Sequence, residues 1–238
     1  MLKNKRKFGI WIILFITLLA FTIICYEYKP SIPETVKSDE SSKIINVKAI
    51  SQYPELPTGC ETVSTVMALN YYDEKISPIY FAENWLVCAD LYTKKDRIYG
   101  PDPNVAFIGT PFSKNGFGCY APVIVRAVNS NSKKCKAENI SGKNLDYICK
   151  EYINNNLPVI LWATMNMKAE KIGRSWYISD SEKFTWIAGE HCLLLIGYDE
   201  KFFYFNDPMG GKTVKYKKDI TEKRYNTLGK QAVLITKK

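Results

Sequence analysis

Residues 52–64 read Gln-Tyr-Pro-Glu-Leu-Pro-Thr-Gly-Cys-Glu-Thr-Val-Ser, and within this stretch the chain changes from an extended segment to a helix. The two prolines lack an N–H group and disfavour helical geometry in the residue before each of them, so no helix is expected before Pro57. Beyond it, apolar residues recur at helical spacing as far as Tyr71. This pattern places Cys60 in the first turn of a helix.

A cysteine at a helix start is more often a buried apolar residue than a nucleophile, and its surroundings decide between the two. Unpaired N–H groups and the positive dipole end at a helix N-terminus favour a thiolate at Cys60. Thr58 and Glu61 have the spacing of a capping box for this helix. The amide of Gln52, eight residues upstream of the cysteine, is a candidate donor to a developing oxyanion.

A second group of candidate residues lies near the C-terminus. His191 is the only histidine and begins an apolar run that ends at Tyr198, and another run from Phe202 leads to Asp207. The two runs predict a β-hairpin with His191 and Asp207 at its open end. A three-residue turn centred on Asp199 would set these two residues opposite each other on one face, whereas a two-residue turn would put them on opposite faces.

Cysteine, histidine and aspartate in this chain order are typical of a papain-like cysteine peptidase. In that chemistry the Cys60 thiolate attacks a carbonyl carbon and His191 holds the proton and returns it to the leaving amine. Asp207 would set the tautomer of the imidazole. The structural alternatives are an ordinary Asx-Pro turn for Asp207 and a backbone-bonded loop amide for Gln52.

Several motifs resemble the peptidases that process bacteriocins by removing double-glycine leaders. They span about residues 44–236 and lie at 52–64, 102–122, 139–142, 157–162, 189–199 and 206–208. The resemblance implies that Cys60 is the nucleophile and His191 the base, that Asp207 orients the histidine, and that Gln52 donates to the oxyanion. The best-known relatives sit at the cytosolic face of ABC exporters, whereas this sequence contains neither an ATPase nor a six-helix membrane domain. A stand-alone, membrane-anchored peptidase is therefore expected.

The N-terminal region has the pattern of a membrane anchor. Residues 8–25 carry no charge and follow four basic residues within 1–7, a length and flank that suit a span with its N-terminus in the cytoplasm. We expect a cytosolic stub (1–7), a transmembrane anchor or signal segment (8–25), a linker (26–42) and a peptidase-like catalytic domain outside the membrane (43–238). Bulky residues at 22–26 do not form a small-x-small cleavage site, and secretion after signal cleavage is the alternative.

Charge and cysteine content narrow the function classes. Four of the 33 basic residues precede the apolar run, which leaves 29 against 24 acidic residues. No basic cluster alternates with aromatic residues, so nucleic-acid binding is not expected. The seven cysteines show no short regular spacing and one histidine is present, so neither a metal nor a cofactor is expected. Cys135 with Cys149, or Cys88 with Cys119, are candidate disulfides; the alternative is that these and Cys192 are buried thiols.

The order of the elements predicts an α+β fold, with a helical half packed against an antiparallel sheet and a cleft between them. The segment 88–117 is rich in Gly, Pro and Asp and is expected to be an irregular connection that shapes the cleft. We expect helices at 60–72, 78–86, 121–128, 145–155 and 220–225, and strands at 44–50, 137–140, 158–164, 176–178, 184–187, 191–198, 202–206, 213–216 and 231–236.

The expected function is hydrolysis of peptide bonds on the outer face of the membrane, in a peptide, a protein or a cell-wall peptide. Two alternatives keep the same fold. One is a catalytically silent relative that binds a peptide or cell-wall ligand without cleaving it. The other is an acyl transferase that uses the same three residues.

Overall fold

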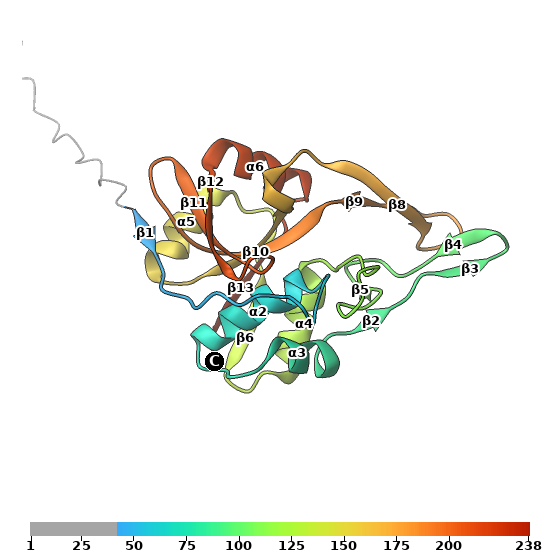
Figure 1. The fold of residues 1–238 in the computed structure, drawn as a ribbon, viewed down its shortest axis with the longest axis horizontal. Coiled ribbons are helices and arrows are strands. Elements are labelled where there is room, and N and C mark those ends of the chain that lie inside the picture. Colours follow the sequence, from blue (N-terminus) through green and yellow to red (C-terminus); the bar gives the residue numbers. More distant parts are fainter. Residues whose placement is uncertain (1–41) are drawn as a thin grey trace, which may run out of the picture. The chain divides into compact units, whose positions relative to one another are not determined.

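In the computed structural model, which describes residues 42–238, one seven-stranded antiparallel sheet organises the fold (Figure 1). The predicted α+β class is confirmed. The predicted stub, the anchor segment and most of the linker lie outside the described residues. The strands follow one another in space as β12 (Lys212–Lys217), β11 (Phe202–Asp207), β10 (Glu190–Tyr198), β7 (Val159–Thr164), β13 (Ala232–Lys237) and β6 (Cys135–Asn139), with β1 (Lys43–Ile44) paired to β10.

The middle of this sheet is covered on both faces. Every residue of β7 and of β10 is buried, which explains why both strands read as continuous apolar runs in the sequence. Burying one leucine side chain of this kind stabilises the fold by roughly 1.5–3 kcal/mol. The two strands that the apolar runs predict most clearly are therefore also buried along their whole length.

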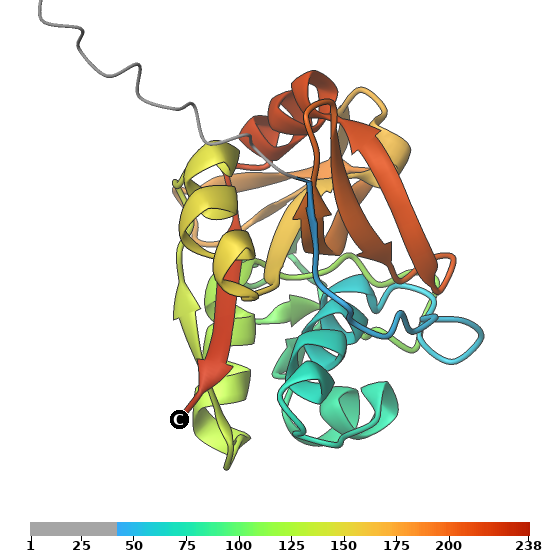
Figure 2. The same ribbon diagram turned by 90° about the vertical axis from the view of Figure 1, so that its left-hand side faces the viewer.

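Helices cover the sheet from two sides (Figure 2). The helix α2 packs against β10 and β7, α4 packs against β6 and β13, and α6 packs against β7. All residues of α2 from Cys60 to Leu69 are buried, so this helix is enclosed rather than amphipathic. The predicted helices are confirmed, with bounds α2 (Cys60–Tyr71), α3 (Pro78–Asn84), α4 (Ala121–Asn131), α5 (Leu145–Glu151) and α6 (Lys218–Thr227), and 3-10 turns at Ile153–Asn155 and Met165–Met167.

The segment 88–117 is more regular than predicted. It contains β2 (Cys88–Ala89), β3 (Tyr92–Lys94), β4 (Arg97–Tyr99) and β5 (Phe107–Ile108). A separate four-stranded sheet has the order β3-β4-β8-β9, with β8 (Lys171–Tyr177) and β9 (Lys183–Ala188); we call this sheet the arm. Strands of two or three residues are too short to show a period, which is why the sequence did not predict them.

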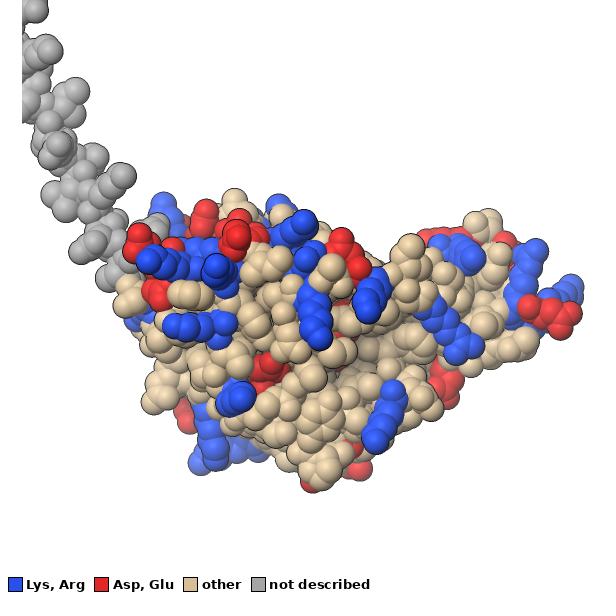
Figure 3. Space-filling model, turned by 45° about the horizontal axis from the view of Figure 1, so that its top comes forward, with Lys and Arg blue, Asp and Glu red and all other residues tan. Residues whose placement is uncertain are grey.

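The arm projects to one side of the central sheet (Figure 1). Its base is an aromatic cluster in which Trp186 stacks on Tyr120 with ring centroids 5.6 Å apart, and Phe117 and Trp176 pack nearby. Figure 3 shows basic and acidic side chains interspersed over one face of the molecule, with uncharged surface between them. Because Trp186 belongs to β9, which ends at Ala188, the cluster lies next to the point where the chain passes from the arm into β10 of the central sheet.

The predicted strand at 44–50 is shorter in the structure. Ladder pairing ends at Ile44, although the Ile45 N–H still donates to the Ile196 carbonyl. Beyond this point the segment belongs to no strand. The Val47 carbonyl accepts from the Asn206 amide at 2.8 Å, and the Ile50 N–H reaches the Met67 sulfur in the second half of α2 at 3.3 Å. The segment therefore leaves the sheet and contacts α2 before it reaches Gln52.

The cysteines do not form the candidate disulfides. Cys88, Cys119 and Cys135 carry free thiols, so neither the 135–149 pair nor the 88–119 pair exists. Cys119, Cys135 and Cys192 are buried, as the alternative predicted, whereas Cys88 is exposed. Within residues 42–238, no helix combines the length and apolar character that a membrane span requires.

Candidate active site

Cys60 is the first residue of α2, as predicted, but the cap of that helix differs from the prediction. The N-cap residue is Gly59, and no side chain caps the helix. The Thr58 hydroxyl instead donates to the Thr110 and Ser113 carbonyls at 3.3 and 2.9 Å. Thr58 thus ties the start of α2 to a neighbouring loop, and Glu61 is left available for another role.

His191 and Asp207 form a buried pair on adjacent strands. His191 Nε2 and Asp207 Oδ1 are 2.9 Å apart, and the two residues are 2% and 6% exposed. The same carboxylate oxygen accepts from the Met209 N–H at 2.8 Å. Burial opposes the charge on Asp207, but the hydrogen bonds from His191 and Met209 outweigh it and hold the pKa of Asp207 below its usual value. The predicted contact between these two residues is confirmed.

The hairpin reaches this contact by a different register from the predicted one. Tyr198 pairs with Phe203, so four residues form the turn rather than three. Without correction this register would place Asp207 on the face opposite His191. The register shifts between Leu195 and Gly197, and this bulge of one residue restores the shared face.

Asp199 occupies the turn, at the far end of the hairpin, as predicted. Its carboxylate accepts from the Lys201 and Phe202 N–H groups, each at 2.7 Å, and from the Tyr204 hydroxyl at 2.7 Å. These bonds hold the pKa of Asp199 below its usual value, with the tyrosine hydroxyl as the main cause. Asp199 is therefore a turn residue in this structure.

Gln52 is buried, and its backbone is tied to the residue that follows Asp207. The Gln52 N–H donates to the Pro208 carbonyl at 2.8 Å. The side-chain Nε2 donates to the Pro57 carbonyl at 2.9 Å, and Oε1 has no hydrogen-bond partner. One N–H of the amide is used by the loop, as the structural alternative proposed, and its second N–H is not bonded within the described residues.

Gln52, Cys60 and His191 border one cavity of about 320 Å³. The structure thus brings together residues that are far apart in the chain. Asp207 contacts His191 but is not part of the cavity lining. Other walls come from the loop after β5 and from the arm, including Phe117, Arg174 and Trp186. The prediction that the segment 88–117 shapes a cleft is confirmed for its C-terminal part.

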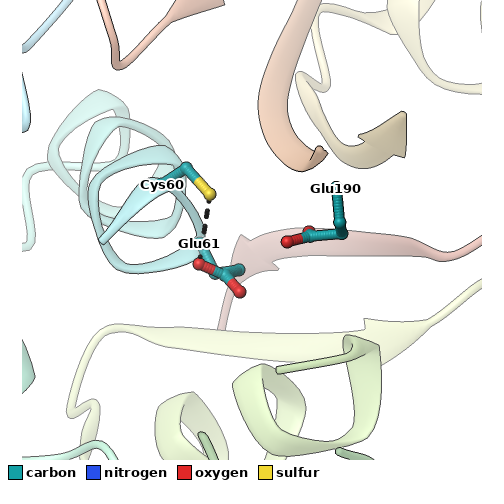
Figure 4. Close-up of side chains that lie close together, drawn as sticks. All are labelled: Cys60, Glu61 and Glu190. Carbon is teal, nitrogen blue, oxygen red and sulfur yellow. Dashed lines mark hydrogen bonds between the residues drawn. The ribbon is translucent and has the colours of Figure 1, made fainter. Parts of the chain in front are cut away.

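The Cys60 thiol points toward the carboxyl group of Glu61 (Figure 4). Its sulfur lies 3.2 Å from Glu61 Oε2, and no hydrogen bond joins it to His191 among residues 42–238. Burial first, and then the charges of Glu61 and Glu190, raise the pKa of the Cys60 thiol well above its usual value. The expectation of a resting thiolate is therefore wrong for this arrangement.

Glu61 and Glu190 form a buried carboxyl pair beside the thiol, and sequence reasoning missed both residues. They are 0% and 5% exposed. Glu61 Oε1 accepts from the Cys119 N–H at 2.7 Å, whereas Glu190 Oε1 has no partner. Burial raises the pKa of Glu61 to about 7, and burial together with the charge of Glu61 raises the pKa of Glu190. The signal in the sequence was their position, each next to a predicted catalytic residue.

Gly118 makes room for this pair. A Cβ atom at position 118 would overlap Glu61 Oε1 and lie 3.1 Å from Glu190 Oε2. The φ angle of Gly118 is +145°, which side-chain-bearing residues rarely adopt. The backbone of the loop before α4 is thus in close contact with both carboxyl groups.

A cysteine at a helix start that borders the same cavity as a histidine, with the histidine paired to a carboxylate on an antiparallel sheet, defines a papain-like cysteine peptidase arrangement. Residues 44–233 match the Peptidase_C39 like family, and the chain belongs to this family. The resemblance to bacteriocin-processing peptidases that the motifs indicated is confirmed at the level of the family.

Similar proteins come from bacteria. The chain is 29% identical over 200 residues to the uncharacterized protein YvpB of Bacillus subtilis, covering 83% of this chain and 77% of YvpB. A putative C39-like peptidase from Bacillus anthracis has a similar structure, with a TM-score of 0.73, 24% identity and coverage of 83% of this chain and 99% of that one. The peptidase domain of Streptococcus ComA is less similar, with a TM-score of 0.45, 14% identity and coverage of 81% and 98%.

Proposed function

We propose that this protein is a cysteine peptidase that hydrolyses peptide bonds on the outer face of the membrane. Cys60 is the nucleophile and His191 the base. Asp207 orients the histidine, and Gln52 donates to the oxyanion. The observation that carries the proposal is the buried His191–Asp207 pair, with 2.9 Å between Nε2 and Oδ1, on the border of the cavity that also contains Cys60.

The His191–Asp207 contact determines which ring nitrogen can act as the base. Because the Asp207 carboxylate accepts from Nε2–H, the neutral imidazole carries its lone pair on Nδ1. Cys60 must turn from Glu61 toward Nδ1 to transfer its proton. The sulfur then attacks the carbonyl carbon, and the imidazolium protonates the leaving amine. Water releases the acyl group with His191 again acting as base.

The raised pKa of Cys60 affects the timing of these steps. A thiol that is protonated at rest transfers its proton as substrate enters, rather than from a preformed ion pair with the imidazole. The second N–H of the Gln52 amide is available for the oxyanion, because only one is bonded to Pro57. Substrate binding is thus expected to separate the thiol from Glu61.

The decisive experiment compares peptides released from the surface of cells that carry wild-type protein or Cys60→Ala. New N-termini that appear only with the wild type, and that also disappear with His191→Gln, are expected. Identical sets of N-termini from all three strains, at equal protein levels, would contradict the peptidase proposal.

The location outside the membrane is part of the proposal and is supported by the N-terminal sequence. The uncharged run at 8–25 follows the basic residues of 1–7, and such flanks stay in the cytoplasm. This orientation would put the catalytic domain, 43–238, outside. Substrates would then be peptides, proteins or cell-wall peptides in that compartment. If the segment is cleaved, the domain would instead be secreted.

The state of the Cys60 thiol favours the catalytically silent alternative. The thiol is hydrogen-bonded to Glu61, and burial raises its pKa, so little of it is in the reactive thiolate form. A silent relative would bind the same peptide with wild type and Cys60→Ala and would cleave it with neither. A thiol-directed peptide probe distinguishes the two functions, because only a peptidase couples probe binding to rapid alkylation of Cys60.

A further inference from the structure

Three side chains beside the nucleophile have the donor atoms of a metal site. Cys60 Sγ and one carboxylate oxygen each of Glu61 and Glu190 all lie within 4.8 Å of one another. All three side chains are buried, and they come from the start of α2 and the start of β10 (Figure 4). His191 is not part of this group, which within the described residues consists of Cys60, Glu61 and Glu190.

Within residues 42–238, no cationic side chain balances the negative charge that Glu61 and Glu190 carry when they are ionised. In the described part of the chain, no lysine, arginine or histidine forms an ion pair with Glu61 or Glu190. Buried carboxylates without a partner cost several kcal/mol. A separate observation points to a ligand: Glu190 is 5% exposed, its Oε1 has no hydrogen-bond partner, and the residue borders the cavity.

The donor set selects the kind of ion. A thiolate with two carboxylates suits Zn²⁺, whereas Ca²⁺ and Mg²⁺ prefer oxygen donors alone. A tetrahedral Zn²⁺ needs donor atoms about 3.3–3.8 Å apart, since Zn–S and Zn–O bonds are about 2.3 and 2.0–2.2 Å. The Cys60 sulfur and Glu61 Oε2 are already 3.2 Å apart, and the Glu190 oxygen lies within 4.8 Å of both partners, so a small movement of the Glu190 side chain brings all three donor atoms to this spacing. The cavity admits water as a fourth ligand.

We propose that Cys60, Glu61 and Glu190 bind a thiophilic divalent cation, with Zn²⁺ as the best match, and that the bound ion blocks the nucleophile. Binding breaks the S–H bond and forms an S–Zn bond, and Glu61 and Glu190 coordinate as carboxylates. The thiol proton and any proton held by the two carboxyl groups leave to solvent, without any change in oxidation state. The ion occupies the side of Cys60 that faces the carboxylates, away from His191. Removal of the ion by a chelator restores the thiol.

The test measures Zn²⁺ affinity of the full chain in detergent by competition with a chromophoric chelator, and the reaction of Cys60 with iodoacetamide. We expect one Zn²⁺ per chain and protection of Cys60 that a chelator reverses. Glu61→Gln and Glu190→Gln should each weaken the affinity by at least about 10–100-fold, because loss of a mere hydrogen-bond partner of a ligand already costs this much. His191→Gln and Cys88→Ser should leave it unchanged. Co²⁺ should give a thiolate charge-transfer band that Cys60→Ser removes.

Two outcomes would overturn the proposal. One is the absence of Zn²⁺ binding and protection in wild-type protein. The other is a loss of affinity in His191→Gln with none in the two glutamine variants, which would place the ion between Cys60 and His191. Glutamine has nearly the shape of glutamate, and the melting temperatures of both variants verify that they fold. None of these measurements requires turnover, so a failure of the peptidase proposal is distinguishable from a failure of this one.

Discussion

At Cys60, the positive end of α2 and two buried carboxyl groups act on the thiol in opposite directions. A helix N-terminus stabilises a nearby negative charge by about 0.3–1 kcal/mol. A carboxylate about 4 Å away destabilises it by about 4 kcal/mol at an effective dielectric constant of 20. Burial and the two carboxyl groups therefore outweigh the helix N-terminus, and the pKa of the Cys60 thiol is raised.

This balance predicts how Cys60 reacts with iodoacetamide. In metal-free protein, alkylation should be slow at mildly acidic and neutral pH and should rise only at alkaline pH, because the thiolate is the reactive form. Glu190→Gln removes one negative charge and should shift the rise to lower pH. Mass spectrometry of the peptide that contains Cys60 measures the rate. Rapid alkylation of wild type at mildly acidic pH would contradict this account.

Glu61 makes folding stability depend on pH. Its pKa is raised from 4.5 to about 7 by burial, so the folded state holds a proton that the unfolded state releases between these values. This stabilisation is fully present below the unfolded pKa and is lost as pH rises through about 7. With chelator present, Glu61→Gln should show a smaller fall in melting temperature between mildly acidic and mildly alkaline pH. Parallel curves for the two proteins would show that Glu61 does not titrate there.

The His191–Asp207 bond predicts a contrast between two aspartates. Asp207→Asn can favour the wrong tautomer of the histidine and should lower turnover by at least about tenfold while the fold persists. Asp199→Asn is the matched control, since its Oδ1 can still accept the turn N–H groups. Peptide hydrolysis and circular dichroism measure the two effects. Loss of turnover in Asp199→Asn with full turnover in Asp207→Asn would refute the assignment.

At the scale of the elements, the loop before α4 packs closely on the carboxyl pair through Gly118. Gly118→Ala should lower the free energy of unfolding by about 2–3 kcal/mol, because the Cβ overlaps Glu61 Oε1 and the φ angle is unfavourable. Gly142→Ala is the control: its φ is +89°, but no atom lies within 4 Å of the added Cβ, so about 1 kcal/mol of backbone strain is expected. Denaturant unfolding that gave equal losses would contradict the packing argument.

Elements with long apolar runs could be predicted from the sequence, and those with short ones could not. The runs at β7 and β10 and the spacing in α2 identify these elements because burial dictates their composition. The strands β3 and β4 have three residues each and depend on pairing within the arm. The hairpin register could not be predicted, because the turn shifts the pairing by one residue and the bulge shifts it again, so that His191 and Asp207 still share one face.

The candidate site shows the same division. Cys60, His191 and Asp207 could be predicted as candidate site residues because each belongs to a motif in a fixed chain order. Glu61 and Glu190 could not be assigned, since their importance arises only when α2 and β10 meet. A capping box was a reasonable local prediction for Glu61, but tertiary contact with the Cys119 N–H took precedence.

At the scale of the whole molecule, the location of the catalytic domain is a prediction that rests on residues 1–25. Protease added to intact cells or spheroplasts should degrade the domain from about residue 43, because the basic flank retains the N-terminus in the cytoplasm. A cytosolic protein in the same sample, which must remain intact, is the control for lysis. Full protection of the domain would show the opposite orientation.

The contact between Cys60 and Glu61 has a consequence for redox chemistry. Peroxides and disulfides react with thiolates and hardly with thiols. Cys60, the nucleophile of the proposed mechanism, rests as a protonated thiol at 3.2 Å from a carboxyl group and is 7% exposed, so we expect it to be protected from oxidation to sulfenic acid. Oxidants would reach the reactive form only during the brief period when substrate has drawn the sulfur toward His191, and at that moment the substrate itself covers the sulfur.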